Sequence, residues 1–241
     1  MAKRVFLKAE WRKLLMINYE VDVEAILPYM PAHTEPDLYH GKCLVSIVGF
    51  MFLNTRVKGM KIFSHINFEE VNLRFYNTHK TATGEVRRGT TFIKEIVSKP
   101  AITFIANTLY KEKYVTLPMG NTIHEHGQEL EVEYRWRYNK KINLVRCKAE
   151  KKLNPMAQNS LEEFITEHYW GYTKLSLTET SEYAVEHPRW ETYRITDFHV
   201  DIDFEGLYGQ GFAALKDQKP HSVLLAEGSE ILVRGGDRIR A

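Results

Sequence analysis

Cysteine and long apolar runs are both scarce in this chain. Cys43 and Cys147 are the only cysteines among 241 residues and lie far apart, which excludes a disulfide scaffold and favours a reducing compartment. The longest apolar run, residues 44–53, is far shorter than the roughly 18 residues that span a bilayer. The opening MAKRVFLKAEWRKLL is too charged for a signal peptide. We therefore expect a cytoplasmic protein that has no membrane partner.

The chain has no large excess of positive or negative residues, and it lacks the common sequence motifs of nucleotide-binding proteins and hydrolases. The chain has 33 Lys and Arg residues against 31 Asp and Glu, a balance that argues against nucleic acid as a partner. It contains no Walker loop, GxGxxG, GxSxG or HExxH, which counts against nucleotide, nicotinamide, esterase and zinc-protease functions. His124 and His126 flank Glu125 without a third ligand at a telling spacing, so we expect neither a metal nor a cofactor.

The pattern of the chain predicts many strands and few helices. No linker, low-complexity tract or internal repeat divides residues 1–241, so we expect a single domain. Pro100 suits the first turn of a helix, and Ser160 with Glu163 has capping-box spacing. Together these signals predict a mainly β fold, an antiparallel barrel or sandwich with a few flanking helices. Helices are expected over residues 23–29, 100–109 and 160–168, and strands over residues 13–19, 42–52, 70–76, 90–97, 130–138, 142–149, 169–177, 183–187, 192–196 and 223–233.

The strand expected at residues 70–76 has a polar and an apolar face. Glu70, Asn72 and Arg74 share one side, and Val71 and Leu73 share the other. Side chains two residues apart on a strand stand roughly 7 Å apart, near enough to act on one ligand. If the polar face lines a barrel, its carboxylate and guanidinium form an acid–base and anchoring pair. If the polar face is exposed to solvent, Val71 and Leu73 form the core on the other face. Alternation alone favours this second interpretation.

The segment YKEKY, residues 110–114, follows the expected central helix. Neighbouring lysines can lower one another's pKa and free an amine for Schiff-base chemistry, which makes Lys111 and Lys113 candidates. Cations near a helix C-terminus are also simply favourable against the helix dipole. His168 and His187 are further candidate pocket residues, and a core histidine bonded to a backbone carbonyl explains either one equally well.

Several segments of the chain resemble a known family. The resemblance is carried, in this order, by WRKLLMINYEVDVEAILPYMP, FEEVNLRFYN, RRGTTFIKEIVSKPA, FITEHYWGY and VEHPRW. These strings are similar to the uncharacterised YqjF-like family (domain of unknown function 2071), which is placed in the acetoacetate decarboxylase-like superfamily. The resemblance implies a closed or nearly closed, cone-like antiparallel β-barrel with a ligand cavity and a few flanking helices.

The same resemblance implies roles for Glu70 and Arg12. The decarboxylase has an aromatic-x-Glu on the matching strand, with the Glu pointing into the cavity, and residues 68–70 reproduce that pattern. An Arg near the decarboxylase N-terminus meets the substrate carboxylate, ahead of a Tyr, an Asp and a Pro. The residues at matching spacing here are Arg12, Tyr19, Asp22 and Pro31. Glu70 is thus expected to point inward and Arg12 to anchor an anion, provided that neither strand slips by one residue.

The Schiff-base lysine of the decarboxylase has no counterpart in this chain. In the decarboxylase the helix ends in Pro-Lys-Lys, and the first Lys forms the imine. Aligning from residues 100–102 with one extra residue puts Lys113 at the proline, Tyr114 at the nucleophile and Val115 at the helper lysine. A phenol cannot form an imine, so the resemblance implies a cavity without imine chemistry. Lys111 or Lys113 supplies the missing amine only if the register slips.

Two classes of function remain open. The first is a lyase- or isomerase-type enzyme whose internal pocket holds a small anionic or carbonyl-bearing metabolite, with Glu70 as acid–base group and Tyr114 as donor to a carbonyl oxygen. The candidate binding residues are Arg12, Arg74, Asn72 and Lys113. The second class is a non-catalytic carrier or sensor that encloses an apolar ligand. An interaction surface on the charged face of residues 131–137 is a weaker interpretation, because such a face is typical of a solvated strand. Superfamily relatives form oligomers, so a homo-oligomer paired through residues 223–233 is implied by analogy.

Overall fold

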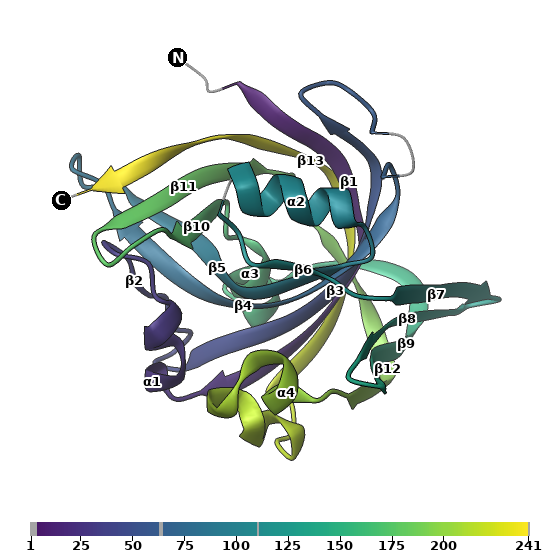
Figure 1. The fold of residues 1–241 in the computed structure, drawn as a ribbon. Helices are drawn as coiled ribbons and strands as arrows, with labels where there is room; N and C mark the ends of the chain where they lie inside the picture. Colours follow the sequence, from purple (N-terminus) through teal and green to yellow (C-terminus); the bar gives the residue numbers. More distant parts are fainter. Residues whose placement is uncertain (1–3, 63–64, 110, 241) are drawn as a thin grey trace.

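A closed ring of strands forms the centre of the molecule in the computed structural model, which describes residues 4–62, 65–109 and 111–240. Each strand pairs with the next, and β1 also pairs with β13, which closes the ring (Figure 1). In order around the ring the strands are β1 (Val5–Val21), β3 (Cys43–Val57), β4 (Phe68–Lys80), β5 (Val86–Val97), β10 (Trp170–Lys174), β11 (Glu179–Glu186) and β13 (Ser222–Arg240). The prediction of a mainly β, barrel-like fold is confirmed.

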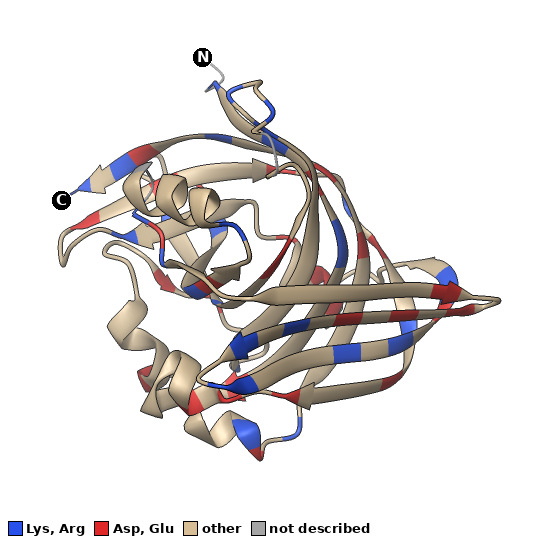
Figure 2. Ribbon diagram, turned by 45° about the vertical axis from the view of Figure 1, so that its right-hand side comes forward, with Lys and Arg blue, Asp and Glu red and all other residues tan. Residues whose placement is uncertain are grey.

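From β13 the sheet continues away from the ring as a second, smaller layer. This layer contains β12 (Glu191–Asp201), β9 (Lys141–Pro155), β8 (Glu129–Tyr138) and β7 (Met119–His126). Its apolar side chains, among them Tyr134, pack against the outer faces of β1, β3 and β4. Gly49 on β3 makes room for this contact, because a Cβ atom there would lie 2.5 Å from the Tyr134 ring. Charged residues alternate with buried ones along β8 and β9, and Figure 2 shows their positions on these strands.

Both faces of β4 are buried, and this decides the question that alternation left open. Val71 and Leu73 are fully buried between the barrel and the second layer. Glu70 and Asn72 are 2% and 1% exposed and point into the barrel, where Arg74 is also buried. The interpretation that the polar face is exposed to solvent is therefore wrong, because the second layer of the sheet covers the apolar face and the barrel encloses the polar one.

Most strand pairs are antiparallel, but β5 pairs in parallel with both β10 and β6 (Tyr114–Thr116). A parallel neighbour needs a crossover connection, and helix α2 (Pro100–Leu109) provides it between β5 and β6. Figure 1 shows α2 lying across one end of the ring. The short strand β2 (Glu35–Pro36) pairs with β4. The sheet is thus mixed rather than wholly antiparallel.

The remaining helices are short. Helix α1 (Val23–Ile26) and the 3₁₀ helix η1 (Leu27–Tyr29) fill the predicted range 23–29, whereas α4 (Phe204–Tyr208) and the 3₁₀ helix η2 (Gln210–Lys216) were not predicted. Helix α3 (Leu161–Thr166) has the predicted capping box: the Ser160 hydroxyl accepts a hydrogen bond from the Glu163 backbone N–H, and the Glu163 carboxylate accepts one from the Asn159 N–H. None of the helices in the described residues has the length and apolarity to cross a membrane.

Candidate functional site

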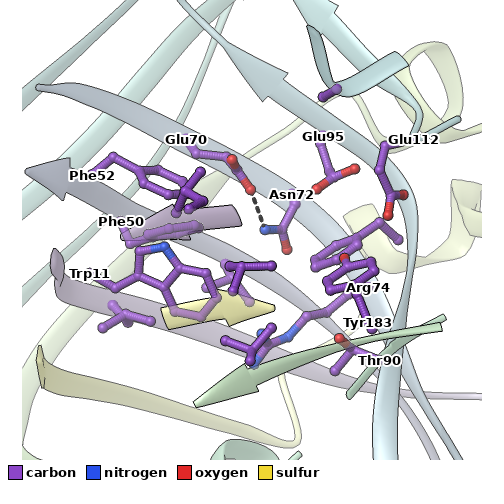
Figure 3. A pocket seen from close by; sticks show the side chains of 18 of the residues that line it. Trp11, Phe50, Phe52, Glu70, Asn72, Arg74, Thr90, Glu95, Glu112 and Tyr183 are labelled. Atoms are coloured by element: carbon purple, nitrogen blue, oxygen red, sulfur yellow. Dashed lines mark hydrogen bonds between the residues drawn. The ribbon is translucent and has the colours of Figure 1, made fainter. Parts of the chain in front are cut away.

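The barrel encloses a cavity of about 140 Å³. One part of its wall is aromatic: the Trp11 ring meets Phe50 edge-on at 5.4 Å, and Phe52 stacks on Phe68 at 4.7 Å between ring centres. Figure 3 shows the rings of Trp11, Phe50 and Phe52 on one side of the cavity and the carboxyl side chains of Glu70, Glu95 and Glu112 beside them. The cavity therefore has an apolar wall and a polar one, which suits a ligand that has both kinds of surface.

Glu70 is the centre of the polar wall. Its carboxylate accepts hydrogen bonds from the Asn72 side-chain amide at 2.9 Å and from the Tyr114 hydroxyl at 3.0 Å. Burial raises the pKa of Glu70 to about 7, although the bonds from Asn72 and Tyr114 oppose the rise and the nearby Glu112 adds to it. A carboxyl group with this pKa exchanges a proton readily near neutral pH.

Two further carboxyl groups, on Glu95 and Glu112, lie beside Glu70. Glu95 stands opposite both Asn72 on β4 and Tyr114 on β6, and it is 2% exposed. Burial and the charges of Glu112 and Glu70 raise its pKa well above the ordinary value. The Glu112 carboxylate accepts a 2.6 Å hydrogen bond from the Thr173 hydroxyl, and burial raises its pKa to about 7. Sequence reasoning missed both as site residues, although a glutamate inside the apolar run of β5 was a signal.

Arg74 lies among the residues that line the cavity, on the same strand as Glu70. Its guanidinium donates a long hydrogen bond of 3.4 Å to the Ile165 carbonyl oxygen and lies 3.8 Å from the Met16 sulfur. Its carbon atom Cζ also lies 5.6 Å from the centre of the Tyr76 ring. Within the described residues no carboxylate comes within ion-pair distance of it. A buried cation in this state is a natural partner for an anionic ligand group.

The structure brings four of the predicted site residues together and places two elsewhere. Glu70, Asn72, Arg74 and Tyr114 all line the cavity. Arg12 instead pairs with Glu10 at 2.7 Å and Glu227 at 3.6 Å, outside the described lining. Its neighbour Trp11 occupies the inward position, because successive side chains of a strand point to opposite faces. This corrects the expectation of Arg12 as the anion anchor.

Lys113, which precedes β6, also lies outside the described lining of the cavity. Glu112 and Tyr114 on either side of it line the cavity, whereas its ammonium group lies 4.8 Å from the centre of the Tyr29 ring. This corrects the expectation of Lys113 as a binding residue. Lys111 is exposed and has a left-handed backbone with φ of 59°, whereas Tyr110 of the same segment lies outside the described residues.

The candidate histidines divide into two groups. His168 and His187 line the cavity, as pocket residues were expected to do. His124 and His126 lie on the exposed end of β7, and across the described ranges no cluster of three or more His, Cys, Asp or Glu side chains is arranged to hold a metal ion.

Solved structures similar to this chain share its fold. Acetoacetate decarboxylase from Legionella pneumophila matches with a TM-score of 0.66 and 10% identity, over 97% of this chain and 87% of that one. An acetoacetate decarboxylase-like enzyme from Sphingomonas wittichii RW1 matches with a TM-score of 0.66 and 12% identity, over 99% of this chain and 94% of that one. The enduracididine biosynthesis enzyme MppR, complexed with pyruvate, matches with a TM-score of 0.65 and 13% identity, over 99% of this chain and 91% of that one. At these identities the likeness shows the fold alone.

Sequence comparison identifies the family. The chain is 30% identical over 79 residues to the uncharacterized protein YqjF of Bacillus subtilis (strain 168); the match covers 32% of this chain and 33% of YqjF, so it spans about a third of that relative. A family model described as an uncharacterized conserved protein matches residues 8–230. Because that match covers nearly the whole sequence, the chain belongs to the DUF2071 family.

Proposed function

We propose that this protein is an enzyme that binds a small carbonyl compound in the barrel cavity and moves a proton on the carbon next to the carbonyl, without forming an imine. The observation that carries this proposal is the meeting of Tyr114 and Glu70: the phenol donates to the carboxylate at 3.0 Å inside the cavity. A positioned base beside a positioned hydrogen-bond donor is the minimal equipment for enolisation, isomerisation or hydration.

Each group has a defined part in the proposed step. The Glu70 carboxylate takes a proton from the carbon next to the carbonyl, the electron pair of that C–H bond forms a C=C bond to the carbonyl carbon, and the π pair of the C=O bond moves to the oxygen. Tyr114 turns its hydroxyl from Glu70 to this oxygen and stabilises the enolate. Burial raises the pKa of Tyr114 well above its ordinary value, so the phenol stays protonated and able to donate. Glu70 then returns the proton to the same carbon, which completes an exchange, or to the far carbon of a conjugated C=C bond in the compound, which completes an isomerisation.

The other residues that line the cavity determine which kind of ligand binds there. Arg74 attracts an anionic group, and the aromatic rings of Trp11, Phe50 and Phe52 contact an apolar part. No lysine lines the cavity within the described part of the chain. The proposal accordingly uses carboxylate and phenol chemistry in place of a Schiff base.

The alternative is a carrier or sensor that holds its ligand unchanged. The aromatic wall supports it, because stacked and edge-on rings are a common lining for bound apolar groups. The three carboxyl groups favour the enzyme, since each is costly to bury and a carrier of apolar ligands gains nothing from them.

Deuterium exchange separates the two functions. Wild-type protein is incubated in D₂O with 4-oxopentanoate, 5-oxohexanoate or 4-phenylbutan-2-one, and loss of the α-proton signals is followed by NMR. We expect exchange above the buffer rate, reduced at least 100-fold in Glu70→Gln and about 10- to 100-fold in Tyr114→Phe. Glu205→Gln, an exposed change on α4, is the matched control and is expected to exchange at the wild-type rate. Binding without exchange identifies a carrier, and equal rates in Glu70→Gln and wild type refute the assigned base.

A further inference from the structure

His168 is a buried group in the cavity wall that the proposed reaction does not use. It follows α3, is 7% exposed, and its Nε2 lies 3.1 Å from the Asp37 carboxylate. The same Asp37 oxygen accepts a 2.7 Å hydrogen bond from Arg88, and the Asp37 backbone N–H donates to the Tyr76 carbonyl oxygen of β4. The Asp37 carboxylate, itself fixed by Arg88 and by β4, therefore holds the His168 ring in one orientation.

The partners of Asp37 decide which ring nitrogen of His168 carries the proton. Burial alone would raise the pKa of Asp37, but the hydrogen bonds from His168 and Arg88 more than offset this and hold it below its ordinary value. An ionised carboxylate only accepts, so Nε2 must donate and carry the hydrogen. Burial lowers the pKa of His168 to about 4, so the ring is neutral at pH 7. Nδ1 is then a bare acceptor, and it has no hydrogen-bond partner among the described residues.

Arg74 lies close enough to His168 for its charge to lower the pKa of the imidazole, and it carries a donor that is unpartnered in the part of the chain that the structure describes. Arg74 is 9% exposed, and its Nε also has no partner within the described chain. Both side chains contact the same ring, with the His168 ring centre 4.7 Å and the Arg74 Cζ 5.6 Å from the centre of Tyr76. Buried polar atoms are nearly always satisfied in folded proteins. Arg74, a cation with an unused donor, and His168, with an unused acceptor, both line the same cavity and therefore indicate which groups a bound ligand carries.

We propose that Arg74 and His168 form a subsite that binds a 2-hydroxycarboxylate group, with the carboxylate on Arg74 and the hydroxyl donating to Nδ1 of His168. A plain carboxylate offers Nδ1 no donor, and a 2-oxo acid presents it with a second acceptor. A 2-amino acid offers a donor but brings a second positive charge beside Arg74. The hydroxy acid alone among these satisfies the cation, the donor and the acceptor together.

This inference rests on the ligand-binding part of the proposed function and names the ligand class for it. Glu70 and Arg74 are four residues apart on β4, about 13 Å between Cα atoms at the rise of an extended strand. Their long side chains both reach into the same cavity. A ligand that uses both ends is therefore a 2-hydroxy acid whose chain carries its reactive carbonyl several bonds from the carboxylate.

A titration with four matched aromatic acids tests the subsite. Trp11 and Trp190 line the cavity, so tryptophan fluorescence reports binding. The probes are mandelate, phenylacetate, phenylglyoxylate and phenylglycine at pH 7.5. We expect mandelate to bind about tenfold more tightly than the other three. His168→Phe is expected to remove that preference and leave phenylacetate binding unchanged, while Arg74→Met weakens all the acids at least tenfold. His199→Phe, an exposed change on β12, is the control.

Asp37→Asn gives a second test that does not remove the imidazole. An amide at this position can donate to Nε2, which moves the ring hydrogen to Nδ1 and turns the subsite acceptor into a donor. The preference is then expected to change from mandelate to phenylglyoxylate. Equal binding of mandelate and phenylacetate by the wild type overturns the subsite, as does equal loss of both in His168→Phe.

Two other outcomes also decide the matter. Displacement of mandelate by inorganic phosphate at similar concentration overturns the assignment to hydroxycarboxylates. A wild type that prefers mandelate but exchanges no deuterium with ketones supports the subsite and refutes the proposed catalysis alone, so the two failures are distinguishable.

Discussion

Replacement of Glu70 by Gln should make the protein more resistant to high pH. Glu70 is 2% exposed, and its pKa of about 7 lies well above the ordinary value of 4.5. Below pH 4.5 the group is protonated in both the folded and the unfolded chain. Between pH 4.5 and 7 only the folded chain holds the proton, so the free energy of unfolding falls as pH rises through this window. Above pH 7 the loss is complete.

The size of the effect follows from the shift. At about 1.4 kcal/mol per pKa unit, the difference between 4.5 and 7 corresponds to about 3 kcal/mol of unfolding free energy. Burial raises the pKa of Glu112 in the same way, but Glu112 is present in both the wild type and the Glu70→Gln variant. The difference between wild type and Glu70→Gln therefore reports the loss of the Glu70 carboxylate together with its charge interactions with Glu95 and Glu112.

Urea unfolding at pH 4.5, 5.5, 6.5 and 8, followed by circular dichroism, measures this difference. We expect Glu70→Gln to gain about 3 kcal/mol on wild type between pH 4.5 and pH 8, while Glu205→Gln on the surface of α4 stays parallel to wild type. Parallel pH curves for Glu70→Gln and wild type would refute the reasoning, because they would mean that the carboxylate is as well solvated in the barrel as in the unfolded chain.

Two further predictions concern the packing of the barrel and the missing amine. Gly49→Ala should lose about 2–3 kcal/mol of unfolding free energy, because its Cβ would lie 2.5 Å from the Tyr134 ring; Gly120→Ala, whose Cβ would lie 3.5 Å from its nearest neighbour, is the control, and equal stability of the two variants would contradict the close contact. Borohydride treatment with 5-oxohexanoate should leave Lys111 and Lys113 unlabelled by mass spectrometry, because neither is among the described residues that line the cavity, and a covalent adduct at either would reinstate imine chemistry.

The sequence predicted the elements better than their partners. Alternation located β4 and β8, and the capping box located α3, because these patterns depend on residues within a few positions of each other. Arg12 shows the limit. The pairing of β1 with β3 shifts register between Arg12 and Leu15. A shift of one position reverses inward and outward, and no local pattern in this strand announces it.

The group of three carboxyl side chains, Glu70, Glu95 and Glu112, shows the same limit of sequence-based prediction for residues that are far apart in the chain. Glu70 was identified by its strand and by resemblance, whereas Glu95 and Glu112 reach it only through tertiary pairing. Glu95 joins through the β4–β5 register, and Glu112 arrives because α2 carries the chain back to lie parallel to β5. Both pairings connect segments whose distance in sequence says nothing about their distance in space.

The amino-acid order by itself determined that this chain forms a mainly β fold and that residues 70–74 carry a polar row on one face of a strand. Its resemblance to the decarboxylase implied that Tyr114 stands at the position of the Schiff-base lysine. Only the tertiary structure decided that this row faces the barrel interior. The physical reason is that alternation distinguishes two faces of a strand without saying which one is enclosed. Here the second layer of the same sheet buries the apolar face, and ring closure leaves the charged face inside.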